Sequence, residues 1–283
     1  MTGQLPAVLT LEARGDGRYG APNPTDDPEG RDVVFSGQIL AQMIMVSDAV
    51  AHGEKEAKSI HAVFARAGRY SAGPMELVVD PMHAGRAWAS NTITAVQGDV
   101  LLSRGLVLMN AVEPDLIRHS PRMPDVPGPE DCEPTTFGVV YPDAEARLVD
   151  RPDAVTEDGS PVMYVWVRAP EAYDSIAANQ AIVAWSEPGL VIGTAMRPHS
   201  GEIDISQAHR SISTGVISHT AHFHDHAEGG EWLLIAHAAS YAGNGRVYGS
   251  GAVFTHRGAL VSTFGQDSMV RAVEAPLDFK RAM

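Results

Sequence analysis

Two stretches of this 283-residue chain carry the apolar pattern of a largely buried helix. In SGQILAQMIMVSDAV, residues 36–50, apolar side chains recur at helical spacing, and Ser36 is a candidate N-cap. A comparable stretch lies in EAYDSIAANQAIVAWSEP, residues 171–188, and ends at Pro188. Each is followed by segments that are rich in β-branched residues and bounded by glycine, which is typical of antiparallel strands. The pattern therefore predicts a helix followed by a sheet, twice.

Short matches between the two halves indicate an internal duplication. GRAWAS at 85–90 is echoed by GRVYGS at 245–250, and GDVLLS at 98–103 by RGALVS at 257–262. SIHAVF at 59–64 is echoed by ISHTAHF at 217–223. All three pairs follow the same order at an offset close to 160 residues, which favours a repeated helix-plus-sheet unit over chance similarity.

The segment between the two patterns differs in composition. Stretches such as RMPDVPGPEDCEP and VDRPDAVTEDGSP are rich in proline and acidic residues. Proline at this density interrupts helices and central strands alike. We therefore predict an N-terminal unit over residues 1–110, a connector over 111–161 and a C-terminal unit over 162–283.

Composition narrows the class of function. The net charge of −14 argues against a nucleic-acid partner, which requires a basic surface. No apolar run approaches the ~20 residues that span a bilayer, and the first residues lack a secretory pattern, so no membrane insertion is expected. Cys132 is the only cysteine, which excludes disulfides within the chain and cysteine-based zinc clusters. These features favour a cytoplasmic protein.

Several segments together resemble one known family. They are VVFSGQILAQMI, SIHAVFARAG, HAGRAWASNTITAVQGD, VWVRAP and SHTAHFHDHAEGGEWLL, followed by GALVSTFGQDSMVR. This set is similar to the acyl-CoA thioesterase II family, the TesB-like proteins, over nearly the whole chain, with the connector weakest. The resemblance implies an α+β double hotdog fold, in which two fused units each wrap an antiparallel sheet around a long helix.

The resemblance also implies a reaction and its residues. TesB-like enzymes cleave fatty acyl-CoA with a water held by an Asp, a Thr or Ser, and a Gln, and need no cofactor. Carried over by position, these residues are Ser218, Ser240 and Gln266. Ser218 is the departure, because it lacks the carboxylate that would assist the water. Gly37 at a predicted helix start would let the thioester oxygen approach backbone N–H groups.

Substrate-binding residues are expected around this site. The histidines His61, His219 and His224 lie in the segments that carry the resemblance. The phosphates of CoA would be met by arginines, for which Arg66, Arg86 and Arg246 are candidates on an otherwise acidic chain.

The stretch VISHTAHFHDH places four histidines, His219, His222, His224 and His226, within eight positions. Imidazoles at alternate strand positions can converge on a metal ion, with Asp225 or Glu228 assisting. The resembling family is not known for needing a metal. We therefore expect a strand that borders the active site, and no metal.

Two other functions are open on the same scaffold. The loss of the carboxylate at Ser218 fits a protein that binds acyl-CoA or an acyl carrier without cleaving it. Asp204 and His209 in DISQAH have the spacing of a hotdog enoyl-CoA hydratase motif, although Ser206 and Gln207 replace its Asn and Pro. Whichever of these functions holds, we expect a homo-oligomer, because a hotdog pair leaves sheet edges open.

Overall fold

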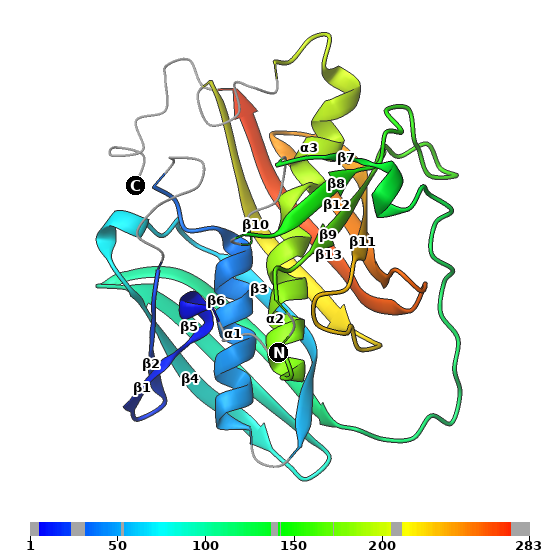
Figure 1. Ribbon diagram of the computed structural model, residues 1–283. Helices are drawn as coiled ribbons and strands as arrows, with labels where there is room; N and C mark the ends of the chain where they lie inside the picture. Colours follow the sequence, from blue (N-terminus) through cyan, green and yellow to red (C-terminus); the bar gives the residue numbers. More distant parts are fainter. Residues whose placement is uncertain are drawn as a thin grey trace.

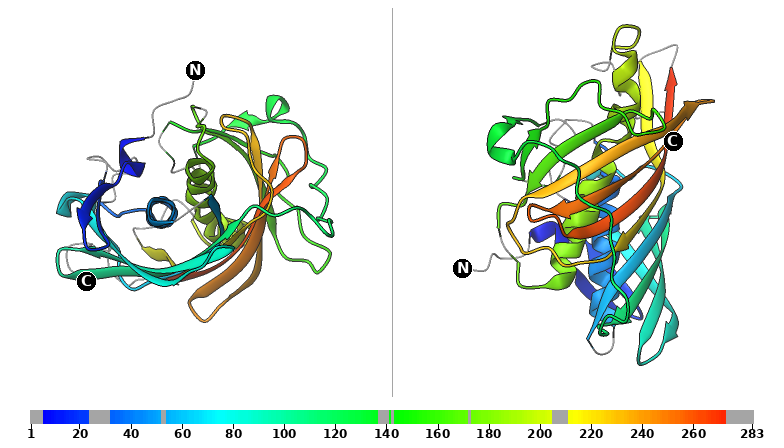
Figure 2. Two further views of the ribbon diagram at one scale, coloured as in Figure 1. Left: turned by 90° about the horizontal axis from the view of Figure 1, so that it is seen from below. Right: turned by 90° about the vertical axis from the view of Figure 1, so that its right-hand side faces the viewer.

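The computed structural model describes residues 6–23, 32–51, 54–136, 141, 143–171, 173–204 and 211–272. Within these ranges the strands form one antiparallel sheet of thirteen, in the order β1-β2-β4-β5-β6-β3-β10-β13-β12-β11-β9-β8-β7. The sheet curves around two helices, α1 and α2, that lie side by side (Figures 1 and 2). The α-helices among the described residues are α1 (Ser36–Val50), α2 (Ile176–Ser186) and α3 (Val191–Met196).

The first half supplies the strands on one side of the sheet. They are β1 (Glu12–Gly15), β2 (Arg18–Ala21), β3 (Lys55–Phe64), β4 (Met75–Ala84), β5 (Trp88–Gln97) and β6 (Val100–Ala111). In β5, buried and partly exposed residues alternate along the strand. Such alternation is expected of a strand with one face on the core.

The second half repeats this arrangement on the other side. Its strands are β7 (Glu133–Pro134), β8 (Glu145–Leu148), β9 (Val162–Arg168), β10 (Ile212–Phe223), β11 (Leu233–Gly243), β12 (Arg246–Thr255) and β13 (Leu260–Ala272). The two halves meet where β10 pairs antiparallel with β3, from Ser218 opposite Val63 to His222 opposite Ser59. One continuous sheet therefore crosses the boundary between the halves.

Irregularities in the strands show that the halves are copies of one unit. The break in register between Ala57 and Ser59 of β3 matches that between Val216 and Ser218 of β10. The β4 and β11 strands are likewise both irregular near their ends, and so are the β5–β6 and β12–β13 pairs. Gly85 and Gly245 lie in the equivalent hairpins β4–β5 and β11–β12. The predicted duplication is confirmed.

The two helices run antiparallel and pack closely. Nearly every residue of α1 from Gly37 to Ser47 is buried, as the apolar pattern predicted. The helix starts one residue earlier than expected, because Phe35 occupies the N-cap position and Ser36 is already helical. The prediction of Ser36 as N-cap is therefore wrong. The α2 helix does have a serine cap, since Ser175 Oγ accepts a hydrogen bond from the Ala178 N–H.

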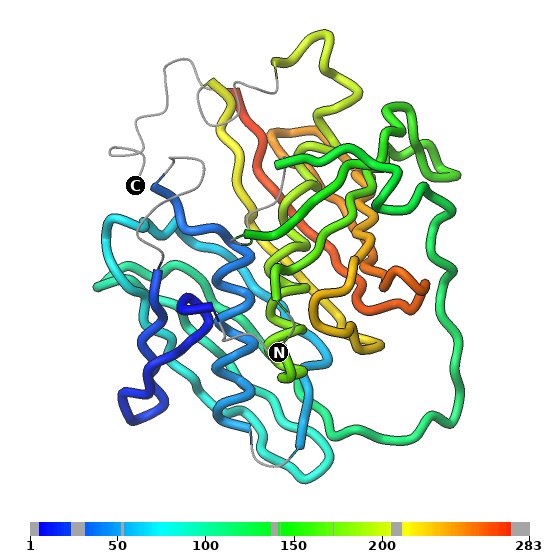
Figure 3. Tube along the Cα trace, in the orientation of Figure 1, coloured from blue at the N-terminus to red at the C-terminus, as the bar shows by residue number. Residues whose placement is uncertain are grey.

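The connector packs against the outer face of the second half. Figure 3 shows residues 112–132 passing around the outside of the molecule. There Cys132 joins a small second core with Trp166 and Leu234, and the Trp166 indole donates to the Pro127 carbonyl at 2.9 Å. Further along, β7 and β8 extend the sheet beyond β9. Among the described residues, no helix has the combined length and apolar character needed to cross a membrane.

Candidate active site

The histidines of the His-rich stretch do not converge on one point. The β10 strand ends at Phe223, so His219 and His222 lie in the strand while His224 and His226 follow it. Each meets a different side chain: Glu187 for His219, His61 for His222, Thr263 for His224 and Glu56 for His226. Within the described ranges no group of three or more His, Cys, Asp or Glu side chains is placed to hold a metal ion.

His219 belongs to a buried polar cluster at the end of α2. Its Nε2 lies 2.9 Å from Oε2 of Glu187, the first residue after the helix. The other oxygen, Oε1, accepts a hydrogen bond from the Ser262 hydroxyl at 2.5 Å. All three side chains are buried. A buried carboxylate is stable only when its oxygens are hydrogen-bonded, and both oxygens of Glu187 are.

Gln266 is joined to the same cluster. Its Oε1 lies 3.2 Å from Nδ1 of His219, directly across the β10–β13 pair. Its Nε2 donates to Ser268 Oγ at 2.9 Å and, at 3.5 Å, to the carbonyl oxygen of Pro188. Glu187, Ser262, His219, Gln266 and Ser268 are called the Glu187 cluster below. Of the residues predicted from the sequence, the structure thus brings Gln266 and His219 together.

The hydrogen bonds of the Glu187 cluster fix its proton count. The Pro188 carbonyl can only accept, which places the Gln266 NH₂ group on that side and its oxygen toward His219. His219 Nδ1 must therefore carry a hydrogen. One further proton then lies between His219 Nε2 and Glu187 Oε2, because two bare acceptors would repel each other. The pair thus holds two protons.

A second buried histidine, His237, secures the backbone of Glu187. Its Nε2–H donates to the Glu187 carbonyl oxygen at 3.1 Å. Complete burial lowers the pKa of the His237 imidazole to about 4, so this ring is neutral at pH 7. Both the side chain and the carbonyl of Glu187 are therefore held by histidine.

The two predicted serines lie apart from Gln266. Ser218 is partly buried and lies directly opposite Asp267 in the register of β10 and β13. Side chains alternate along a strand, so Ser218 faces the other side of the sheet from its neighbour His219. Ser240 is exposed at the irregularity of β11. None of the side-chain hydrogen bonds among the described residues links either serine to Gln266, and their catalytic roles stay predictions.

The packing of α1 against α2 explains why residue 37 is a glycine. A Cβ on this residue would overlap the carbonyl oxygen of Trp185 in α2. Only glycine lets the two helices approach this closely. The contact also places the first turn of α1 at the same end of the helix pair as Glu187. The role of Gly37 toward a substrate oxygen stays a prediction.

The three predicted arginines divide between the two ends of the sheet. Arg66 follows the end of β3, whereas Arg86 lies in the β4–β5 hairpin at the opposite end of the same strands. Arg246, in the β11–β12 hairpin, lies at the Arg66 end and forms a 2.6 Å ion pair with Asp267. Arg66 and Arg246 thus lie toward the end that holds Ser218, and Arg86 does not.

The remaining predicted histidines lie at the outer face. His61 Nδ1 is 3.2 Å from the Thr220 hydroxyl, and its ring meets His222 edge-on at 5.4 Å between centroids. His224 Nε2 is 2.9 Å from Thr263 Oγ1. Partial burial, assisted by the nearby His222, lowers the pKa of both His61 and His224. Both rings are therefore uncharged at neutral pH, which makes them poor ligands for phosphate.

Of the hydratase-like segment, Asp204 is described, but Ser206, Gln207 and His209 lie outside the described residues.

Comparison with known proteins identifies the family. A family model described as the acyl-CoA thioesterase C-terminal domain matches residues 119–270. The chain belongs to this family. An acyl-CoA thioesterase 2 from Haemophilus influenzae is 26% identical over 259 residues, covering 85% of this chain and 88% of its own length. Acyl-coenzyme A thioesterase 8 from Homo sapiens is 23% identical over 264 residues, covering 84% of this chain and 80% of its own.

Solved structures of similar proteins share the fold. The acyl-CoA thioesterase II TesB2 from Mycobacterium marinum is 22% identical, with a TM-score of 0.80 over 94% of this chain and 98% of that one. A tesB protein from Mycobacterium avium is also 22% identical, with a TM-score of 0.77 over 94% and 97%. The predicted α+β double hotdog fold is therefore confirmed.

Glu187, Ser262, Ser268 and His237, which lie around His219 and Gln266, were not among the residues predicted from the sequence. Glu187 and His237 were assigned no role from the sequence. A signal for Glu187 was present, because an acidic residue directly after a largely apolar helix is placed where α2 meets the sheet. Only the fold shows that His219, Ser262 and His237 meet it there.

Proposed function

We propose that this protein hydrolyses acyl-CoA thioesters to the free acid and CoA, using water and no covalent intermediate. Membership of the acyl-CoA thioesterase family supports the reaction class. The observation that carries the proposal is the contact between Gln266 and His219. It places the residue expected to hold the water against a histidine that is itself oriented by a buried carboxylate.

In the proposed mechanism, Gln266 positions the attacking water. Besides its 2.9 Å bond to Ser268 Oγ, its Nε2 makes a long bond of 3.5 Å to the Pro188 carbonyl, and a water molecule can take that second place at little cost. The water oxygen bonds to the thioester carbon, the C–S bond breaks, and the proton that the water loses ends on the sulfur of CoA. The charge that develops on the carbonyl oxygen would be met by N–H groups of the first turn of α1, near Gly37.

In this mechanism His219 positions Gln266 and is not the base, because its Nδ1–H donates to Gln266 and its Nε2 already shares a proton with Glu187. Ser218 brings no carboxylate, whereas His219 contacts both Gln266 and Glu187. Ser218 and Ser240 are kept as proposed secondary contacts to substrate. Arg66 and Arg246, which lie toward the same end, are proposed to meet the CoA phosphates.

Release of free CoA from a panel of acyl-CoAs of different chain length tests the proposal. Wild-type protein is expected to release CoA, and Gln266→Leu to lose at least tenfold in kcat, within the range for losing a positioned base or water. Arg86→Ala, at the other end of the strands, is the control and is expected to leave kcat unchanged.

Other outcomes of the same panel would assign another function. Binding of acyl-CoA without release of CoA would indicate an acyl-CoA-binding or acyl-carrier-binding protein. Hydration of an enoyl-CoA would indicate a hydratase.

We also propose that the protein forms homo-oligomers. The outer face of β3 and β6 exposes three apolar side chains, Val63, Leu106 and Leu108. Burial of these side chains in an interface between subunits would remove their apolar surface from water. Light scattering at micromolar concentration is expected to give a mass above the 30.2 kDa of one chain. A mass of one chain only would contradict this. The cytoplasmic location and the lack of a cofactor expected from the sequence stay predictions.

A further inference from the structure

Two carboxylates are buried among the described residues, and they lie toward opposite ends of α2. Glu187 follows the last residue of the helix and has both oxygens hydrogen-bonded. Glu56, on β3, lies beside Gln180 in the first half of the helix. The ends of an 11-residue helix are about 15 Å apart, so the two carboxylates belong to separate places.

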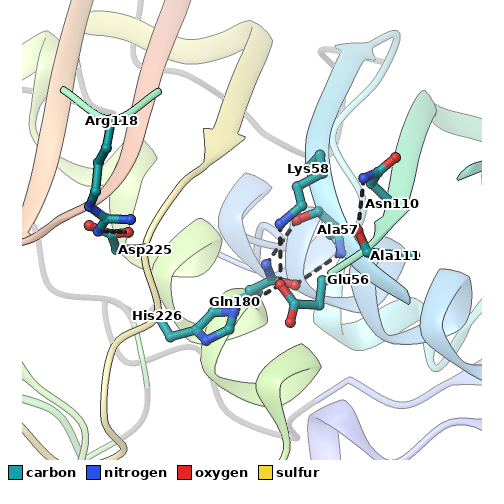
Figure 4. Close-up of polar contacts among 9 residues, drawn as sticks. All are labelled: Glu56, Ala57, Lys58, Asn110, Ala111, Arg118, Gln180, Asp225 and His226. Atoms are coloured by element: carbon teal, nitrogen blue, oxygen red, sulfur yellow. Dashed lines mark hydrogen bonds and ion pairs between the residues drawn. The ribbon is translucent and has the colours of Figure 1, made fainter. Parts of the chain in front are cut away.

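Side chains from three segments gather around Glu56 (Figure 4). His226, from the segment after β10, places Nε2 2.8 Å from Oε2 of Glu56. Lys58 Nζ lies 3.2 Å from the same oxygen. Gln180, from α2, binds both the N–H and the carbonyl of Ala57, at 3.2 and 2.9 Å. The carboxylate is therefore held in place from both halves of the protein.

The Glu56 carboxylate is ionised and only partly satisfied. Burial raises its pKa, but the hydrogen bonds from His226 and Lys58 outweigh this and leave the pKa below its usual value. Only 7% of the residue is exposed, and Oε1 is buried with no hydrogen-bond partner in the described residues. A buried carboxylate oxygen without a partner is costly, and a functional role is one reason for which such a group is kept.

The contact with Glu56 sets the chemical character of His226. Because Oε2 is an ionised acceptor, Nε2 of His226 carries the hydrogen of this bond. In the neutral ring, Nδ1 is then the acceptor and can take a proton. The side chain is 51% exposed, so a substrate or water can reach it. This is a base oriented by a carboxylate, as in nucleophile-activating dyads.

A small, mainly apolar cavity of about 20 Å³ adjoins the dyad. It is lined by His226, Asn179 and Gln180 and by apolar side chains that include Phe223 and Val183. This volume holds about one water molecule. A second cavity of about 30 Å³ shares Asn179 and Val183 and continues along α2. Its lining is mainly apolar, and one wall is the loop from Ala227 to Glu231, which brings Glu228 and Glu231. Together the two cavities mark an apolar path along α2.

We propose that Glu56 and His226 form a second thioester-hydrolysing site, at the N-terminal half of α2. The proposal rests on the proposed function, because it assumes the same class of substrate. His226 Nδ1 takes a proton from water, the water oxygen bonds to the thioester carbon, and the C–S bond breaks. The imidazolium then returns the proton to the departing sulfur. Glu56 orients His226, and the small cavity beside His226 has room for the attacking water.

The experiment separates the two sites in the full-length protein. Hydrolysis of the acyl-CoA panel is measured in a Gln266→Leu background, in which the first site is disabled. We expect a residual turnover there, and we expect His226→Ala or Glu56→Gln to lower that residual by at least tenfold. Added imidazole is expected to restore part of the loss in His226→Ala, which a purely structural histidine would not show. Arg118→Ala removes the neighbouring 2.7 Å ion pair to Asp225 and is the matched control.

Each result has a distinct meaning. A residual turnover that His226→Ala leaves unchanged, or a Gln266→Leu protein with none, overturns the second site while the proposed function stands. A wild-type protein that cleaves no acyl-CoA overturns both. If Gln266→Leu does not fold, His226→Ala is made in the wild-type chain. There, a loss of turnover with imidazole rescue supports the second site, and no loss or no rescue overturns it.

Discussion

Replacing Glu187 tests whether the end of α2 is held by a charge or by hydrogen bonds alone. Glu187→Leu removes both acceptors, so that the His219 ring and the Ser262 hydroxyl lose their buried partner. Glu187→Gln keeps the shape and offers a different set of bonds. The new amide oxygen can accept from Ser262, and the new NH₂ can donate to Nε2 of a neutral His219. Nδ1–H of His219 still donates to Gln266.

The two variants should differ in stability by several kcal/mol. Removing one partner of a buried, charged hydrogen-bonded pair costs about 3–5 kcal/mol, which is a large part of the ~5–15 kcal/mol that stabilises a typical domain. At about 2 °C per kcal/mol for a chain of this size, Glu187→Leu is expected to lower Tm by roughly 6–10 °C. Glu187→Gln leaves no buried group of the cluster unpaired, so we expect it to cost about 1 kcal/mol.

Thermal unfolding followed by circular dichroism measures both changes against wild-type protein. If the Tm of Glu187→Gln falls as far as that of Glu187→Leu, the negative charge itself is required and the proposed hydrogen-bond exchange is refuted. If neither variant loses more than about 1 kcal/mol, the cluster does not hold the end of α2. Turnover adds a further check, because Glu187→Gln preserves the His219–Gln266 contact and should retain activity.

Three further substitutions give separate tests. Ser218→Asp is expected to raise turnover by less than tenfold, about 1.4 kcal/mol, because Ser218 does not contact Gln266; a larger gain would assign the activating role to position 218. Lowering the pH from 7 to 5 should reduce the free energy of unfolding by about 2 kcal/mol through His237. Its pKa of about 4 in the folded protein lies below the pKa of histidine in the unfolded chain, so over this range protons bind the unfolded chain and favour it. His237→Gln should flatten that dependence in urea unfolding, and an unchanged slope would contradict it. Gly37→Ala should destabilise by about 1–3 kcal/mol through overlap with Trp185, whereas Gly215→Ala, with open space around it, is the control.

The sequence was sufficient for the fold because the fold repeats. Both helices were visible as apolar stretches, and three short matches located equivalent strands in the two halves. The exact ends of the helices were less predictable. The N-cap of α1 is Phe35 and not Ser36, because the position of an N-cap depends on tertiary packing. The short helix α3, Val191–Met196, was also not foreseen, since six residues carry too little periodic signal.

The site was only partly visible from the sequence, because its contacts cross between distant segments. Gln266 and His219 are 47 residues apart, and each could be placed by resemblance alone. Their meeting with Glu187 depends on where a helix end falls against a sheet, which no local pattern encodes. The same holds for Glu56 and His226, which are 170 residues apart and come from different halves.

The matched irregularities of the strands identify equivalent positions in the two halves, and these positions differ in polarity. The offset of 159 residues that relates Ser59 to Ser218 also relates Ile60 to His219 and Val107 to Gln266. In the first half these positions are apolar and buried. Two identical subunits would have to bury the costly polar group twice, once on each side of their symmetry axis. A single chain with two unequal halves escapes that constraint, so one half can serve as an apolar support while the other carries the reactive groups.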